Sequence, residues 1–141
     1  MVRRVAVLAC IALGAGVACG GGKDKGEKDA ASKACPAAPA ELAKAPKLPT
    51  GFPLPAEVTF TGTHRVGPST IVTGYWAGEI DEAFDGYEKA FKNASGYEIT
   101  KDEHEEVDAE VNFSGGSSTG QVKLLQTCKD RTSVTITIRP A

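Results

Sequence analysis

Residues 132–139 read TSVTITIR, and this C-terminal stretch alternates apolar and polar side chains without interruption. Its apolar residues take every second position: Val134, Ile136 and Ile138. Successive side chains of a β-strand point to opposite faces of a sheet. The stretch therefore predicts a strand with one buried face and one face rich in hydroxyl groups.

The same alternation recurs toward the N-terminus. It is present in residues 121–127, which contain Val122 and Leu124, in residues 107–113, and at Tyr97 and Ile99. Residues 57–65 and 69–77 also alternate, and the Gly67-Pro68 pair between them is typical of a turn. These two segments predict a hairpin, and the later ones predict a run of strands.

One segment between the predicted strands has the period of a helix. Its apolar residues form a single face at helical spacing: Ile80, Ala83, Phe84, Tyr87, Phe91 and Ala94. Asp81 is expected to cap the N-terminus of this helix, and Gly96 is expected to end it.

The order of these elements predicts an α+β fold. We expect a β-β-α-β-β-β antiparallel sheet with one amphipathic helix packed on one face, formed by residues 52–141. The opposite face of the sheet is expected to be largely exposed to solvent and rich in threonine.

The N-terminus has the pattern of a secretory signal. Residues 1–18 contain Arg3 and Arg4, then an apolar run of about 14 residues and small side chains, which is the order of a signal peptide. The run is shorter than the roughly 17–25 residues that a transmembrane helix requires. We therefore expect residues 1–18 to be a signal peptide and not a permanent membrane span.

The end of this segment, Val17-Ala18-Cys19, resembles the lipobox of bacterial lipoproteins. In that family the cysteine is acylated and becomes the new N-terminus. The resemblance implies lipidation at Cys19 and attachment to a bacterial membrane outside the cytoplasm. Gly16 departs from the family pattern, in which Leu, Val or Ile is usual, and Cys10 follows too short an apolar run to be the modified residue. The alternative is a secreted protein in which Cys19 is a free cysteine.

Residues 19–51 are predicted to be a flexible tether, because they are rich in Lys, Gly, Ala and Pro and have few large apolar side chains. Four cysteines are present, and Cys10 and Cys19 are assigned to the signal peptide and the lipid. In an oxidising compartment the remaining two, Cys35 and Cys128, are expected to form a disulfide. Free thiols and a redox pair remain alternatives.

Charge is unevenly distributed along the chain. Residues 57–141 contain eight Lys or Arg and fourteen Asp or Glu, which gives this region a charge of −6. An acidic domain lacks the electrostatic attraction that supplies most non-specific affinity for nucleic acid. Nucleic acid is therefore not an expected partner.

Residues 102–110 form an acidic run in which His104-Glu105 and Asp108 resemble part of a zinc-binding H-E-x-x-H motif. Asp108 replaces the second histidine, and the motif requires a helix where the alternation predicts a strand. The three residues are therefore candidate metal ligands, and a solvated hairpin tip is the alternative. The sequence predicts no cofactor and no catalytic residues.

Tyr75 and Trp76 are neighbours on a predicted strand, so their side chains are expected to point to opposite faces. One of them is expected to pack under the helix. The other would then be a candidate contact surface for a protein or a glycan partner.

Residues 52–139 also resemble the small domains that many bacterial lipoproteins carry, on the Ala83-Phe84-Asp85-Gly86-Tyr87 segment and the Gly96-Tyr97 pair. That group implies no established activity. The leading hypothesis is a lipid-anchored, non-enzymatic binding or accessory module of the cell envelope. A metal-assisted hydrolase that uses the His104 segment and a passive structural lipoprotein are the alternatives.

Overall fold

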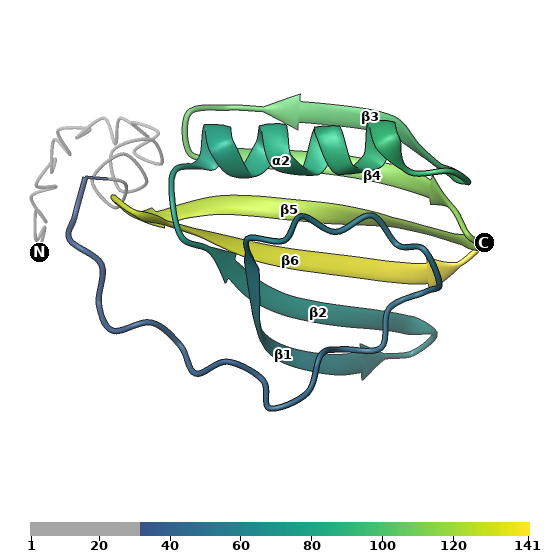
Figure 1. Cartoon of the computed structure of the whole chain (residues 1–141), viewed down its shortest axis with the longest axis horizontal. Helices are drawn as coiled ribbons and strands as arrows, with labels where there is room; N and C mark the ends of the chain where they lie inside the picture. Colours follow the sequence, from purple (N-terminus) through teal and green to yellow (C-terminus); the bar gives the residue numbers. More distant parts are fainter. Residues whose placement is uncertain (1–31) are drawn as a thin grey trace, which may run out of the picture.

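The computed structural model describes residues 32–141, which form one sheet and one helix (Figure 1). The elements along the chain are β1 (Val58–Val66), β2 (Ser69–Trp76), α2 (Ile80–Asn93), β3 (Tyr97–His104), β4 (Asp108–Gly115), β5 (Ser118–Cys128) and β6 (Arg131–Pro140). The strands are antiparallel and lie in the order β1-β2-β6-β5-β4-β3.

Strand β6 holds the two halves of the sheet together. It pairs with β2 on one side and with β5 on the other, so that Ile136 lies between Val72 and Val122. All three side chains are fully buried. The alternating TSVTITIR segment thus forms a central strand of the sheet although it is the last strand in the chain.

The expected α+β class is wrong. Strands make up 49% of the described residues and the helix 13%, so the protein has a mainly β fold with one small helix. The helix has 14 residues and contacts mainly β3, β4 and β5, so it covers only part of the sheet. The rest of that face is covered by irregular chain and not by further helices.

Four strands follow the helix, one more than in the expected β-β-α-β-β-β order, although each of the four contains a segment whose alternation predicts a strand. Strand β3 extends beyond its predicted segment. Its second half, Lys101–His104, is charged and exposed and shows no apolar alternation. This half is a strand because its backbone pairs with β4, from Lys101 opposite Asn112 to His104 opposite Ala109.

Residues 32–57, which we call the strap, run past the β1 edge and return across the face that carries α2 (Figure 1). Leu48, Phe52 and Leu54 of the strap pack against the buried core. The ring of Phe52 makes edge contacts with Phe91 and Phe113, at centroid distances of 5.8 and 5.2 Å. The strap thus contributes side chains to the same core as the helix.

The strap includes residues 32–51 of the predicted tether, and residues 19–31 lie outside the described residues. The amide of Leu42 donates a hydrogen bond of 2.8 Å to the carbonyl of Phe60 on the edge strand β1. Unpaired edge strands favour association with other chains. The strap therefore occupies part of the β1 edge, and the boundary of the folded domain at residue 52 stays a prediction.

Tyr87 lies on the buried face of α2, and its side chain is fully inaccessible. No group of the described residues forms a hydrogen bond with its hydroxyl. Burial disfavours the charged phenolate and therefore raises the pKa of Tyr87 above its ordinary value. This hydroxyl adds little to stability and makes stability sensitive to alkaline pH.

We expect Tyr87→Phe to be at least as stable as the wild type at pH 7, since the buried hydroxyl has no partner to lose. Because the pKa of Tyr87 is raised in the folded state, its ionisation in the unfolded state favours unfolding above about pH 10. Above this pH, each further pH unit should lower the free energy of unfolding of the wild type by up to about 1.4 kcal/mol more than that of the variant. Urea unfolding of both proteins between pH 7 and 11 measures the difference, and a less stable variant at pH 7 would contradict this expectation.

Candidate functional site

The candidate metal ligands are not brought together. His104 lies opposite Ala109, on the face covered by α2, and its ring stacks on Phe84 at a centroid distance of 4.6 Å. Its Nε2 atom lies 3.0 Å from the carboxylate of Asp81 on the first turn of the helix. Histidine 104 therefore joins the β3–β4 hairpin to the helix.

Asp108 points to the other face of the sheet. It pairs with Leu125 of β5, and its carboxylate lies 3.0 Å from the ammonium of Lys123. The hydrogen bond that Lys123 donates to Asp108 raises the pKa of the Lys123 ammonium. Glu105 lies in the turn and donates its backbone amide to the carbonyl of Asp108.

Among residues 32–141, no group of three or more His, Cys, Asp or Glu side chains is arranged to hold a metal ion. His104 and Asp108 lie on opposite faces because Asp108 is the immediate neighbour of Ala109, the partner of His104. His104 therefore packs against the helix, whereas Asp108 pairs with Lys123 on the other face.

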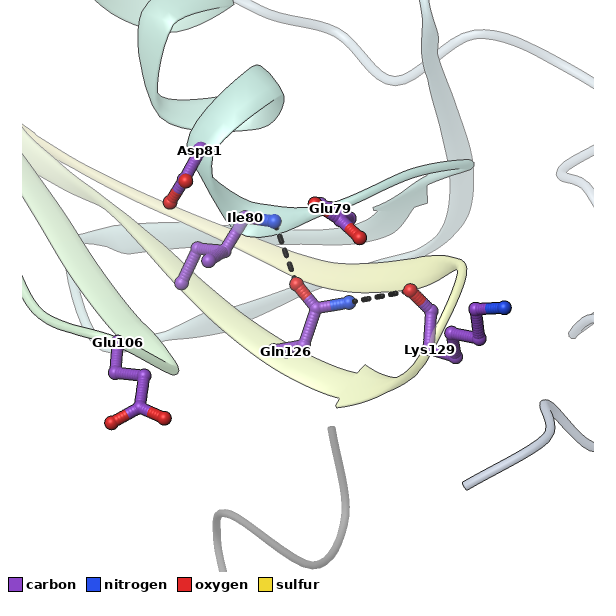
Figure 2. A pocket seen from close by; sticks show the side chains of 6 residues that line it. All are labelled: Glu79, Ile80, Asp81, Glu106, Gln126 and Lys129. Carbon is purple, nitrogen blue, oxygen red and sulfur yellow. Dashed lines mark hydrogen bonds between the residues drawn. The ribbon is translucent and has the colours of Figure 1, made fainter. Parts of the chain in front are cut away.

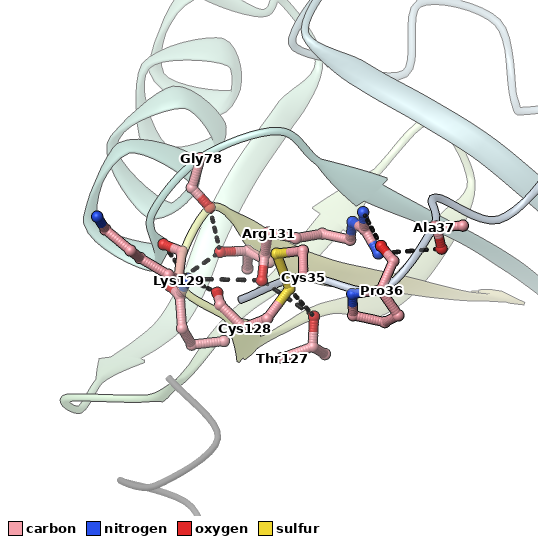
Figure 3. The surroundings of a disulfide bond; sticks show 10 residues. Cys35, Pro36, Ala37, Gly78, Thr127, Cys128, Lys129 and Arg131 are labelled. Carbon is pink, nitrogen blue, oxygen red and sulfur yellow. Dashed lines mark hydrogen bonds between the residues drawn. A yellow bond between two sulfur atoms is a disulfide. The ribbon is translucent and has the colours of Figure 1, made fainter. Parts of the chain in front are cut away.

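Cys35 and Cys128 form a disulfide, with their Cα atoms 5.1 Å apart (Figure 3). Two further contacts hold the same part of the strap. The amide of Lys129 donates to the carbonyl of Lys33 at 2.8 Å, and the guanidinium of Arg131 donates to the carbonyl of Pro36 at 2.8 Å. The start of the strap is therefore fixed to the turn between β5 and β6.

A hollow of about 160 Å³ lies at the N-terminus of α2 (Figure 2). Its lining residues are Glu79, Ile80, Asp81, Glu106, Gln126 and Lys129. This volume is below the roughly 300–1,000 Å³ of typical small-molecule pockets. The hollow marks the place where the helix meets the end of β5.

Gln126 is a buried polar residue that forms hydrogen bonds with both the start of the helix and the end of β5 (Figure 2). Its Oε1 atom accepts hydrogen bonds from the amide of Ile80, at 2.6 Å, and from the hydroxyl of Thr132, at 3.1 Å. Its Nε2 atom donates to the carbonyl of Cys128 at 2.7 Å. Gln126 therefore caps the helix from the sheet.

The prediction that Asp81 caps the N-terminus of the helix is wrong. The helix begins at Ile80 after Glu79, whose side chain makes no capping hydrogen bond, and Asp81 lies within the first turn. The sequence contains no local signal for the role of Gln126, because the residue it caps is 46 positions away.

Tyr75 and Trp76 point to opposite faces of the sheet. Trp76 is 8% exposed and belongs to the core, where its indole ring lies against Gly86 of the helix. Tyr75 is partly exposed on the other face, and the guanidinium of Arg131 lies over its ring at 5.5 Å. The role of Tyr75 in contacting a partner stays a prediction.

We call the face opposite α2 the open face. Its side chains on β2 and β6 are partly exposed, in contrast to the buried ones on the helix side of the same strands: Ile71, Thr73, Tyr75, Arg131, Ser133, Thr135 and Thr137. Sequence alternation predicts such a face, but only the strand order shows which segments are neighbours on it.

Cys19 and the predicted signal peptide lie outside the described residues, so the predicted lipidation site has no structural description. Within residues 32–141, no helix has the length and apolar character needed to cross a membrane.

No protein-family model, no curated protein and no solved structure matches this chain.

Proposed function

We propose that this protein is a lipid-anchored, non-catalytic binding or accessory module of the bacterial cell envelope. In this proposal, residues 1–18 direct export and the acylated Cys19 holds the chain on the outer side of a membrane. The sheet domain then binds an envelope protein or a glycan through its open face.

The proposed binding surface is the open face of the sheet. The helix and the apolar strap residues pack on one face of the sheet, while the other face presents partly exposed side chains of six adjacent strands. These include an aromatic ring, Tyr75, beside a cation, Arg131. Tyrosine and arginine are enriched among the residues that contribute most to binding at interfaces.

The disulfide supports the extracytoplasmic part of the proposal. Disulfides persist mainly in oxidising compartments, such as the bacterial periplasm and the cell surface. The Cys35–Cys128 bond joins the beginning of the strap to the end of β5. A protein with this bond is suited to a location outside the cytoplasm.

The anchor is tested by expressing the full chain in a bacterium, with Cys19→Ser beside the wild type. We expect the wild type to begin at an acylated Cys19 by intact mass and to enter the detergent phase on partitioning. The Cys19→Ser chain should carry no acyl group. Cys10→Ser is the matched control, since it also removes a cysteine from the N-terminal segment, and it should be acylated like the wild type. An unmodified wild-type Cys19 would overturn the anchor.

A further inference from the structure

Charge is unevenly distributed between the two sides of the sheet, whose strand order is shown in Figure 1. The neighbouring strands β1, β2 and β6 contain no Asp or Glu, and they carry one histidine, His64, and three arginines, Arg65, Arg131 and Arg139. Strands β3 and β4 carry five carboxylates and α2 carries four. An acidic domain thus has one half of its sheet without negative charge.

Two arginines mark the ends of this half on the open face. Arg131 and Arg139 are eight positions apart on β6 and therefore point to the same face, about 26 Å apart along the strand. No carboxylate of the described residues forms an ion pair with either of them. Asp130, in the β5–β6 turn, is the carboxylate next to Arg131 in sequence.

Hydroxyl groups fill the space between the arginines. Thr135 and Thr137 are on the same face of β6, and Thr135 lies beside Thr73 of β2. All three are partly exposed. We call Thr73, Tyr75, Arg131, Thr135, Thr137 and Arg139 the cationic strip. It is a row of hydrogen-bonding groups with a positive charge at each end and an aromatic ring near one of them.

We propose that the cationic strip binds an acidic polysaccharide laid along β6, with its carboxylates at Arg131 and Arg139 and its hydroxyls on the threonines. This inference rests on the proposed binding role but not on the lipid anchor. Arginine suits carboxylate groups because its planar donors match their geometry. Threonine hydroxyls both donate and accept hydrogen bonds, as sugar hydroxyls do.

The overall charge of the domain favours this class of anion over denser ones. A polymer with many closely spaced charges, such as nucleic acid, is repelled by the carboxylates of β3, β4 and α2. A polysaccharide with carboxylates spread along a neutral chain can place them at the two arginines. The charge separation then also orients the polymer toward β1, β2 and β6.

The test uses a fluorescent polygalacturonate in which most carboxylates are methyl-esterified, so that the remaining carboxylates are spread along a neutral chain. Its binding to the purified full chain is measured in a non-ionic detergent at low salt. Loss of charge-assisted hydrogen bonds at both arginines should weaken binding by roughly tenfold or more in Arg131→Gln/Arg139→Gln. The matched control is Lys89→Gln/Lys92→Gln, which removes the same charge from α2 and should change binding less than about twofold. Thr135→Val/Thr137→Val keeps the strand shape and should weaken binding severalfold.

Arg131 also holds the strap, so Arg139→Glu provides a variant at an exposed strand end that leaves this contact intact. It should weaken binding while thermal unfolding stays at the wild-type midpoint. Dextran, which is uncharged, should bind more weakly than polygalacturonate to the wild type.

Three results would overturn the inference. One is binding of polygalacturonate no stronger than that of dextran. Another is an equal loss in the α2 control. The third is arginine-dependent binding of single-stranded DNA or of micelles with phosphatidylglycerol in place of polygalacturonate. An acylated Cys19 combined with any of these results would leave the anchor standing and remove only the polysaccharide. Polysaccharide binding by a protein whose Cys19 is unmodified would support the polysaccharide and overturn the anchor.

Discussion

Replacing both Cys35 and Cys128 by alanine is expected to lower the free energy of unfolding by about 4–5 kcal/mol, because the bond closes a long loop in the unfolded chain. The two cysteines are 93 positions apart. This loss is a large part of the roughly 5–15 kcal/mol that stabilises a typical domain. Alanine is used because Cys128 is 2% exposed and a serine hydroxyl would be buried there.

Urea unfolding followed by tryptophan fluorescence measures this effect, with Trp76 as the reporter in the core. Dithiothreitol should lower the unfolding midpoint of the wild type to about that of the double variant. The double variant should not respond to the reductant. A wild type whose midpoint is the same with and without dithiothreitol would show that the bond does not stabilise the fold.

The second large effect is expected at Gln126. Gln126→Met keeps the length of the side chain but removes its amide, which leaves the buried Ile80 amide without its acceptor and the Cys128 carbonyl without the Gln126 donor. The Thr132 hydroxyl keeps the Gly78 carbonyl as an acceptor at 3.1 Å. A buried polar group without a partner costs roughly 1–3 kcal/mol, so we expect Gln126→Met to lower the free energy of unfolding by about 2–4 kcal/mol.

Gln121→Met is the matched control for this substitution. Gln121 is on the same strand, but its side chain lies on the open face and donates to the partly buried carboxylate of Glu110. Its replacement should cost less than about 1 kcal/mol, as usual for surface changes. Equal losses for the two variants in urea unfolding would show that Gln126 has no special role as a cap.

The buried faces of the elements could be predicted from periodicity. The five apolar helix residues from Ile80 to Phe91 that were expected to face the core are all buried. The same holds for Val134, Ile136 and Ile138. Period alone identifies these residues because burial of apolar side chains is the main favourable term in folding.

The candidate metal residues could not be placed by the same counting. Alternation from Tyr97 through Ile99 puts His104 on the face opposite to theirs. A register shift between Ile99 and Lys101 moves it onto the face of α2, against Phe84. A bulge of one residue reverses the side of every later residue in the strand, and its position depends on pairing with β4.

The prediction of the fold class was wrong for a related reason. One clear helix among predicted strands suggested an α+β fold, but the segment that completes the core is the strap, whose apolar residues are few and not periodic. Phe52 joins the aromatic cluster of Phe91, Tyr97 and Phe113 from a proline-rich segment. Local sequence carries no signal for a contact of this kind.

The buried faces of α2, β4, β5 and β6 and the two cysteines that pair could be predicted from the sequence, because they depend on local period and on chemical type. Three features could not be predicted in this way. The last strand lies between β2 and β5, Gln126 caps the helix, and the three strands without carboxylates are neighbours. Each of these depends on contacts between segments far apart in the chain. Their partners are selected by the packing of the whole sheet and not by any local pattern.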